Sequence, residues 1–309
     1  MNVLITGASG FLGKRLIEKI STDPTLSLTG STRRNNKLSS VSSLVFGNLD
    51  SNFDWSHILK NQEVVIHAAG KAHIMDNKTV TSYNEYKKVN LDGTLRLAQQ
   101  ASISGVKRFI FISTIKVNGE KTKKNKPFTE LDKPNPVDGY SLSKWEAEKK
   151  LIEISTKSGM EFVIIRPSLI YGPGVKGNFG KIISLIKRGL PLPLGAINNK
   201  RSFIAIDNLI DLITVCIKHP KASNQLFLAA DGKDLSTSQL IKELAMSANK
   251  NLFLIPIPVI FLKFIASILR KKTVIDRLNE SLQVDISKSK NLLNWTPPIS
   301  IEKGLFLCF

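Results

Sequence analysis

The sequence has few cysteines, few acidic residues and no signal for export. Its 309 residues include two cysteines, Cys216 and Cys308, which lie far apart and lack the spacing of metal ligands. This excludes a disulfide framework and a zinc site, and it is typical of a reducing compartment. The chain opens directly into "MNVLITG", without the basic region and apolar stretch of a signal peptide. We therefore expect a cytoplasmic protein that carries no metal.

Acidic residues are scarce relative to basic ones, with 25 Asp and Glu against 44 Lys and Arg, a net charge of +19. A basic surface can attract nucleic acid or an anionic membrane. The excess is mostly lysine spread along the chain, as at 123–126 and 270–272, and aromatic residues do not interleave with these runs as in a base-stacking platform. We therefore expect a solvated basic surface and no nucleic-acid partner. Weak peripheral attraction to the inner face of a membrane stays open as an alternative.

The longest apolar stretch, "LFLIPIPVIFLKFIASIL" at 252–269, is interrupted by Pro256, Pro258 and Lys263. A helix that spans a bilayer needs about 20 apolar residues with few breaks. We predict a buried helix that starts after the prolines, with docking on a membrane as the alternative, and no transmembrane segment.

Short apolar runs alternate with helical patterns through the first half of the chain. Runs that are apolar nearly throughout are typical of strands buried on both faces of a parallel sheet. Alternation of such strands with amphipathic helices predicts an α/β fold, a Rossmann-type doubly wound parallel sheet. The expected strands lie at 2–7, 26–31, 63–70, 108–114 and 161–167, and the expected helices at 10–21, 86–105 and 140–159.

The pattern loosens after about residue 170. Segments 171–180 ("YGPGVKGNFG") and 188–199 ("RGLPLPLGAINN") are rich in Gly, Pro and Asn and predict loops. Helical patterns follow at 207–218 and 236–248. We expect an NAD(P)-binding domain over 1–170 and a smaller substrate-binding lobe over 171–309, with some elements interleaved.

A glycine-rich turn, "TGASGFLG", places Gly7, Gly10 and Gly13 between the first expected strand and the first expected helix. Glycines at such a turn let the backbone approach a pyrophosphate, which sits at the positive end of the helix dipole. A tight turn without a ligand would use the same residues. The strand–turn–helix context nevertheless predicts that this turn binds a dinucleotide.

The second expected strand ends in "STRRNN" at 31–36. In such folds an acidic residue there normally binds the ribose hydroxyls of the adenosine. Here Thr32 is followed by Arg33 and Arg34. A guanidinium binds a 2′-phosphate that a carboxylate would repel. The sequence therefore favours NADP(H), with NAD(H) as the alternative if both arginines lie on a solvated loop.

A tyrosine and a lysine four residues apart, Tyr140 and Lys144 in "YSLSK", share one face of an expected helix. An ammonium beside a phenol stabilises the phenolate and lowers a tyrosine pKa that is otherwise about 10. Tyr140 would then exchange protons near neutral pH. Ser113 and Thr114 end a strand, where ligands bind in open α/β sheets, and can hydrogen-bond the reacting oxygen.

Several further motifs give the chain a resemblance to the extended short-chain dehydrogenase/reductase family, in its nucleotide-sugar epimerase, dehydratase and reductase branch. The resemblance covers essentially the whole chain. It rests on "TGASGFLG", "GNLD", "VIHAAG", "VNLDGTLRLAQQA", "GVKRFIFIST", "YSLSKWEAE", "IIRPSLIYGPG" and "RSFIAIDNLID".

The resemblance implies a catalytic triad of Thr114, Tyr140 and Lys144, in which Lys144 also binds the nicotinamide ribose. It also implies a UDP-sugar substrate in the second lobe and a homodimer. The cofactor contacts that it implies are Gly7, Gly10, Phe11, Leu12, Gly13, Arg33, Arg34, Asn48, Leu49, Ala68, Ala69, Gly70, Asn90, Tyr140, Lys144 and Pro167. The implied substrate contacts are Ser113, Thr114, Asn178, Leu194 and Arg201, the last against the diphosphate.

Two departures from the family pattern bear on the reaction. The 4,6-dehydratases of the family carry an Asp–Glu pair after the catalytic hydroxyl residue, whereas Ile115 and Lys116 follow Thr114 here. The acidic residue of many 4-epimerases that retain NAD is replaced by Thr32. We therefore expect an NADPH-dependent reductase of a UDP-4-keto-6-deoxy-N-acetylhexosamine, serving surface-polysaccharide or O-antigen synthesis.

Two alternatives stay open beside the reductase. One is a UDP-hexose or UDP-N-acetylhexosamine 4-epimerase that retains NAD. The other is a non-catalytic protein that senses NADP(H), although such relatives usually lose the Tyr or Lys of the pair.

Overall fold

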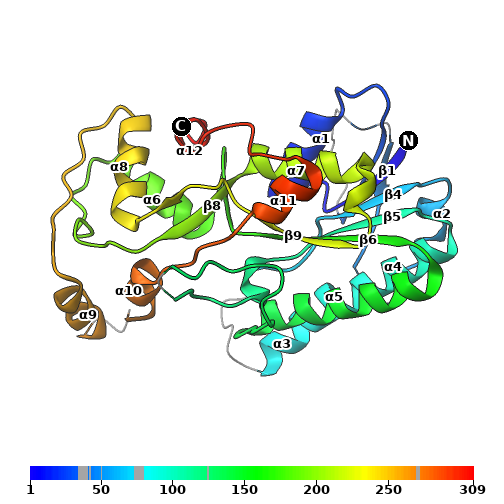
Figure 1. Ribbon diagram of the computed structural model, residues 1–309, viewed down its shortest axis with the longest axis horizontal. Coiled ribbons are helices and arrows are strands. Elements are labelled where there is room, and N and C mark those ends of the chain that lie inside the picture. Colours follow the sequence, from blue (N-terminus) through cyan, green and yellow to red (C-terminus); the bar gives the residue numbers. More distant parts are fainter. Residues whose placement is uncertain (34–40, 42, 50, 73–79, 124, 269–271) are drawn as a thin grey trace.

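The computed structural model describes residues 1–33, 41, 43–49, 51–72, 80–123, 125–268 and 272–309. Within them a large unit is built around a parallel sheet of seven strands in the order β3-β2-β1-β4-β5-β6-β9 (Figure 1). The strands are β1 (Asn2–Thr6), β2 (Ser27–Thr32), β3 (Ser43–Phe46), β4 (Val64–His67), β5 (Arg108–Ile112), β6 (Glu161–Pro167) and β9 (Gln225–Ala229). The predicted doubly wound α/β fold is confirmed.

Helices cover both faces of this sheet, as its apolar strands require. One face carries α1 (Phe11–Ile20), α7 (Ile206–Lys218) and α11 (Ser287–Leu293), and the other carries α2 (Ser56–Leu59), α4 (Gly93–Ile103) and α5 (Gly139–Ser158). The shorter helical segments of this unit are α3 (Val80–Tyr86), η1 (Lys87–Asp92), η2 (Ile115–Val117) and η3 (Pro220–Ala222).

The order of strands reverses beside β1, and this reversal locates the site. The chain runs from β1 through β2 to β3 at one edge, then returns to place β4 on the other side of β1. Ligands of open α/β sheets bind outside the carboxyl ends of the strands at such a reversal. The glycine turn follows β1, and Ala68 to Gly70 follow β4, so both segments lie at this edge.

The smaller unit packs around a sheet of three strands, β7 (Leu169–Tyr171), β8 (Arg201–Ala205) and β10 (Asp234–Leu235). Its core is a separate cluster of buried side chains that includes Tyr171, Phe179 and Phe203. Its helices are α6 (Gly177–Lys187), α8 (Thr237–Ser247), α9 (Val259–Ile268), α10 (Lys272–Asn279) and α12 (Ile301–Phe306). Elements that follow residue 170, among them α7, β9 and α11, belong to the larger unit, so the two units interleave along the chain.

Three expectations from the sequence need correction. Segment 171–180 was expected to be a loop, yet α6 begins inside it at Gly177, because Phe179, Ile183 and Ile186 lie on one helix face and are buried. The expected helix at 86–105 contains a π-helical turn at η1, which sequence periodicity does not reveal. Helix α9 does form after the prolines, but it buries Leu262 and exposes Ile260, Phe261, Phe264 and Ile268.

No helix in the described ranges is long and apolar enough to cross a bilayer.

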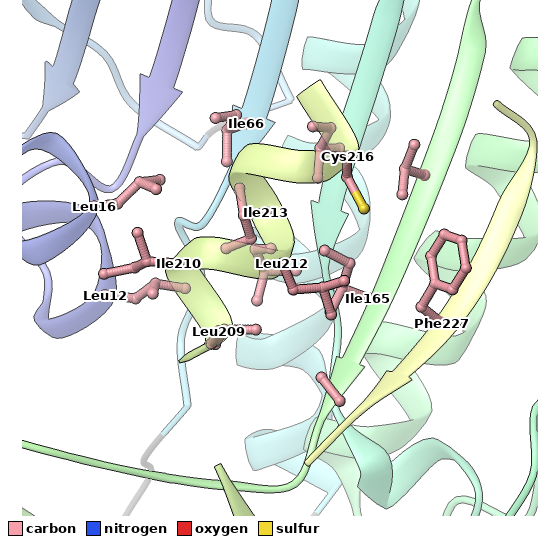
Figure 2. Close-up of a cluster of buried hydrophobic side chains, with 14 of the residues drawn as sticks. Leu12, Leu16, Ile66, Ile165, Leu209, Ile210, Leu212, Ile213, Cys216 and Phe227 are labelled. Carbon is pink, nitrogen blue, oxygen red and sulfur yellow. The ribbon is translucent and has the colours of Figure 1, made fainter. Parts of the chain in front are cut away.

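Helix α7 joins the C-terminal half of the chain to the core of the larger unit. Its apolar face lies between α1 and the sheet, where Leu209, Ile210, Leu212 and Ile213 meet side chains such as Leu16 (Figure 2). An apolar face of this kind, at helical spacing, is the main stabiliser of a surface helix.

We predict that Leu212→Ala lowers the free energy of unfolding by about 2–5 kcal/mol, because Leu212 is fully buried and truncation leaves a cavity. Urea denaturation measures the change. Met246→Ala, at an exposed apolar position on α8, is the matched control and should change stability by no more than about 0.5 kcal/mol. A loss in Leu212→Ala no larger than in the control would contradict the proposed burial of α7.

Candidate active site

Helix α5 carries both Tyr140 and Lys144 at its beginning. Asp138 is the N-cap of this helix and accepts a hydrogen bond from the Ser141 backbone nitrogen at 2.7 Å, as one half of a capping box. A capping box fixes where the helix begins. The two side chains are therefore held at defined positions one helical turn apart, as the sequence predicts.

Lys144 is buried, with 4% of its surface exposed. Its ammonium donates to the carbonyl oxygen of Ile112 at 2.8 Å and lies 4.3 Å from the centroid of the Phe111 ring. Burial lowers the pKa of Lys144 to about 7, although the carboxylate of Glu148 acts in the opposite direction. The group is thus poised to change charge near neutral pH.

Tyr140 is half-buried, and its hydroxyl is hydrogen-bonded to the side chain of Thr114. Thr114 follows β5 in an extended conformation and also accepts a bond from the Lys116 backbone nitrogen at 3.3 Å. Burial, followed by the charge of Asp138, raises the pKa of Tyr140 to about 12, while the bond to Thr114 lowers it. The three residues predicted to form the triad lie together at one edge of the sheet.

The expectation that Lys144 lowers the pKa of Tyr140 needs correction. The ammonium is directed at the carbonyl of Ile112, and it is itself partly neutral near pH 7. Desolvation of the phenol therefore dominates, and the pKa of Tyr140 rises.

Lys116 stands at the position where the 4,6-dehydratases carry the glutamate of their Asp–Glu pair. Its ammonium lies 2.7 Å from Oδ2 of Asp138 and 3.3 Å from Oε1 of Glu120. This ion pair partly compensates the negative charge that raises the pKa of Tyr140. Because the Lys116 ammonium is paired with Asp138, Lys116 influences the pKa of Tyr140 through the charge of Asp138.

Ser113 differs from Thr114 in orientation, because successive side chains of a strand point to opposite faces. Its hydroxyl is buried and donates to the carboxylate of Glu148. Glu148 in turn accepts a bond from Nε of Arg166 at 3.0 Å, and Arg166 donates to Oδ1 of Asn118 at 2.8 Å. Ser113 was expected to contact substrate, but its donor is committed to this buried network beneath Lys144.

The sequence analysis did not single out Glu148 or Arg166. Both side chains are almost completely buried and form an ion pair between α5 and β6. Charged residues are rarely buried without a partner. The one signal in the sequence is Arg166 inside the apolar run "VIIRP", since Glu148 lies among other charged residues in "WEAEKKL".

Asn90 lies in the π-helical turn η1 and connects two parts of the site. Its side chain accepts from the backbone nitrogen of Lys71 at 2.8 Å and donates to the hydroxyl of Ser143 at 3.1 Å. That hydroxyl donates to the carbonyl of Tyr140 at 2.7 Å. Asn90 thus ties the loop after β4 to the first turn of α5.

His67, at the end of β4, is a further buried polar residue that the sequence analysis did not single out. Its Nδ1 lies 2.6 Å from the Thr6 hydroxyl, and its Nε2 lies 2.9 Å from that of Thr94. The ring stacks on Phe111, with ring centroids 5.6 Å apart. Burial, with a smaller contribution from the charge of Lys144, holds the pKa of His67 well below its usual range. The imidazole is therefore neutral and orders the strand ends behind the site.

The glycine turn fits a dinucleotide. Gly7 has φ +73°, and a Cβ there would lie 2.8 Å from the backbone of Ala69, while a Cβ on Gly13 would lie 2.2 Å from the carbonyl oxygen of Gly7. Gly10 is the N-cap of α1, which has no side-chain cap and no acidic residue in its first turn. Backbone N–H groups and the positive end of α1 are therefore accessible to a phosphate at this turn. Phe11 and Leu12 form the first turn of the helix.

The backbone of Gly70 also packs closely, against the side chains of Asn90 and Lys144. A Cβ on Gly70 would lie 3.1 Å from Oδ1 of Asn90 and 3.4 Å from Nζ of Lys144. Ala68, Ala69 and Gly70 therefore lie between the glycine turn and the start of α5.

The end of β2 places Thr32 inside the protein and Arg33 on the surface. Arg34 lies outside the described residues. Asn48 is half-buried. Leu49 is buried and packs against Gly93, since a Cβ on Gly93 would lie 2.8 Å from the carbonyl carbon of Leu49.

The remaining predicted contacts lie farther along the chain. Pro167 is buried at the end of β6, opposite Ala229 of β9. In the smaller unit, Asn178 is exposed at the start of α6, and Leu194 is half-buried. Arg201 begins β8 and donates to the carbonyl of Glu280 at 3.3 Å. The structure therefore joins the triad, the glycine turn and the β4 loop directly, while the substrate residues stand on separate elements.

Comparisons with known proteins agree with this geometry. Residues 3–229 match the family described as the NAD dependent epimerase/dehydratase family. A UDP-glucose 4-epimerase from Vibrio cholerae is 44% identical over 98% of this chain and 93% of its own length. The N-acetyl-alpha-D-glucosaminyl-diphospho-ditrans,octacis-undecaprenol 4-epimerase of Escherichia coli O157:H7 is 30% identical, over 81% of this chain and 73% of that protein.

Among solved structures, the UDP-glucose 4-epimerase of Thermotoga maritima with UDP-glucose superposes with a TM-score of 0.77, at 22% identity, over 99% of this chain and 97% of that one. This likeness concerns the fold. The match over residues 3–229 and the identity to the Vibrio protein show more than the fold. The chain is an enzyme of the extended short-chain dehydrogenase/reductase type and belongs to the NAD dependent epimerase/dehydratase family.

Proposed function

We propose that this enzyme is a 4-epimerase of a UDP-hexose and that it retains NAD. The observation that carries the proposal is the 44% identity, over nearly the whole chain, to the UDP-glucose 4-epimerase of Vibrio cholerae. The sequence motifs favour a 4-ketoreductase that uses NADPH, with the epimerase as the alternative. The comparisons support the alternative, and the description of the matched family names NAD.

The cofactor would be held by the glycine turn, by Ala68 to Gly70 and by Lys144, with Asn48, Leu49 and Pro167 as further contacts. NAD, when bound, supplies a group that accepts a hydride from sugar C4 and returns it. Glycine at positions 7 and 13 lets the turn pack against the backbone of Ala69 and of Gly7 itself, where a Cβ would clash.

Tyr140 would take the proton from the sugar hydroxyl at C4 and give it back in the return step. Thr114 is hydrogen-bonded to the phenolic oxygen and would orient the sugar oxygen beside it. Lys144, when protonated, adds positive charge on the same helix face and so stabilises the phenolate. The pair formed by Lys116 and Asp138 supports this chemistry, because it compensates the nearest negative charge.

Arg201, Asn178 and Leu194 are the proposed contacts of the UDP group in the smaller unit. Arg201 supplies a cation for the diphosphate, as an anion of this charge requires. Dehydration is disfavoured, since Ile115 is apolar and the amine of Lys116 is bound to two carboxylates.

We also propose that two copies associate through α4 and α5. The two helices pack side by side, and Ile103 and Ile152 expose apolar surface on them. A pair of helices from each copy would bury this surface.

We predict that Tyr140→Phe lowers kcat for the conversion of UDP-glucose to UDP-galactose by at least ~100-fold, because the proton acceptor is lost. Binding of NAD, measured by tryptophan fluorescence, should change by less than about threefold. Tyr83→Phe is the matched control, since it removes a hydroxyl that donates to Glu146 from the neighbouring helix α3. Normal turnover in Tyr140→Phe would exclude the assigned role.

We predict that acid release from the purified enzyme yields close to one equivalent of NAD, identified by mass spectrometry. Arg33→Ala should leave this content unchanged, because an exposed Arg33 has no 2′-phosphate to bind in an NAD enzyme. If the enzyme instead binds NADPH much more tightly than NADH, and Arg33→Ala abolishes that preference, the reductase interpretation holds and the epimerase proposal fails.

We predict that the nucleotide-free enzyme gains stability relative to Lys144→Met as pH rises from about 7 to about 10. The pKa of Lys144 is about 7 in the folded chain and near its usual value when unfolded, so the unfolded chain binds the extra proton in this window. Stability from this group is therefore lost as pH falls towards 7. Urea denaturation across the range gives the two curves, and parallel curves would show that Lys144 is not desolvated.

A further inference from the structure

Helix α9 turns its largest apolar side chains outward. The exposed fractions are 77% for Ile260, 58% for Phe261, 66% for Phe264 and 68% for Ile268. Residues 260, 264 and 268 follow at intervals of four, so they form one stripe along the helix. A surface helix normally buries such a stripe. Contiguous apolar surface of this kind marks an interaction site.

The helix is anchored on its opposite side. Leu262 is buried, and the ammonium of Lys263 lies 3.1 Å from Oδ1 of Asp276 on α10. Figure 1 shows α9 at the outer end of the smaller unit, beside α10 and away from the seven-stranded sheet. The outward stripe is therefore presented at an extremity of the molecule, where a flat surface can reach it.

The charge of this region favours an anionic surface as the partner. From residue 244 to residue 275 the sequence has five Lys or Arg residues and no Asp or Glu. The whole chain has a net charge of +19, which attracts it to an anionic surface. An apolar stripe within a basic sequence is typical of helices that lie in the interface of a bilayer with anionic lipids.

The length of α9 fits this orientation. Its ten residues rise about 15 Å, roughly half of the hydrocarbon core of a bilayer. A helix of this length lies along the surface, with its phenylalanine rings between the lipid headgroups and the acyl chains.

Backbone pairing connects α9 to a segment of the proposed substrate site. Leu192 donates to the carbonyl of Phe253 at 3.1 Å, and Gly195 donates to that of Ile255 at 3.0 Å. Leu194 lies between these two residues. The segment before α9 and the loop that carries Leu194 thus form one hydrogen-bonded unit, so a surface that holds α9 also holds this part of the smaller unit.

We propose that α9 is an interfacial helix that docks this enzyme on bilayers rich in anionic lipid, with Phe261 and Phe264 inserted. This proposal concerns the surface alone and does not depend on which sugar is epimerised. Basic residues supply the long-range attraction, and the apolar stripe supplies the insertion.

Sedimentation with vesicles tests the proposal. The full-length enzyme is mixed with vesicles of phosphatidylglycerol and phosphatidylcholine in equal parts, or of phosphatidylcholine alone. We expect binding to the anionic vesicles, at least tenfold weaker binding to the neutral ones, and a decrease with added salt. The double variant Phe261→Ser with Phe264→Ser should bind anionic vesicles at least tenfold more weakly than the unaltered enzyme. Phe46→Ser, which removes an exposed phenylalanine on β3, is the matched control and should bind normally.

Two results would overturn the proposal. Undiminished binding by the double variant would mean that general positive charge, and not α9, holds the enzyme. Absence of binding by the unaltered enzyme at low salt, together with a smaller oligomer for the double variant in light scattering, would identify the stripe as a contact between copies. Unchanged thermal unfolding and epimerase activity of the double variant show that the substitutions leave the fold intact.

Discussion

Burial of the Lys144 ammonium is the constraint on which the arrangement of the site depends. A buried charge is costly unless other groups compensate it. Here the Ile112 carbonyl accepts its hydrogen bond, and the Phe111 ring lies beside it. Glu148 adds negative charge one helical turn farther along α5, and it is itself neutralised by Arg166. Because β5, β6 and α5 each supply one of these groups, none of the three elements can shift without leaving a charge uncompensated.

A second buried network serves the opposite edge of the site. His67 joins the ends of β1 and β4 to α4 through the hydroxyls of Thr6 and Thr94. This fixes the distance between the end of β1, which carries the glycine turn, and the end of β4, which carries the Ala68 loop. The close approach of Gly7 to Ala69 requires this, since a small shift would separate the two backbones that form the cradle. Buried polar networks that are fully satisfied fix a unique arrangement in this way.

The sequence was sufficient for the features that depend on local pattern. Apolar runs and helical spacing located the main strands and helices, and the glycine turn and the Tyr140–Lys144 pair were found by their spacing. Contacts between residues that are far apart in the chain could not be predicted from the sequence pattern. The partner of Lys116 is Asp138, 22 residues away, and the partner of Ser113 is Glu148. The exposure of α9 was missed for the same reason, because an apolar helix looks alike in sequence whether or not another element covers it.

The choice between reductase and epimerase illustrates a limit of motif reasoning. Both reactions need a proton donor and acceptor at the C4 oxygen, so Thr114, Tyr140 and Lys144 would serve either equally well. What separates the two is whether the cofactor leaves after each turnover. That depends on how closely the protein encloses the dinucleotide. Arg33 is exposed at the end of β2, where a charge could contact only the adenosine end of a cofactor. A charge there selects between cofactors, but the enclosure itself governs retention, and this is why the arginine was a weak guide to the reaction.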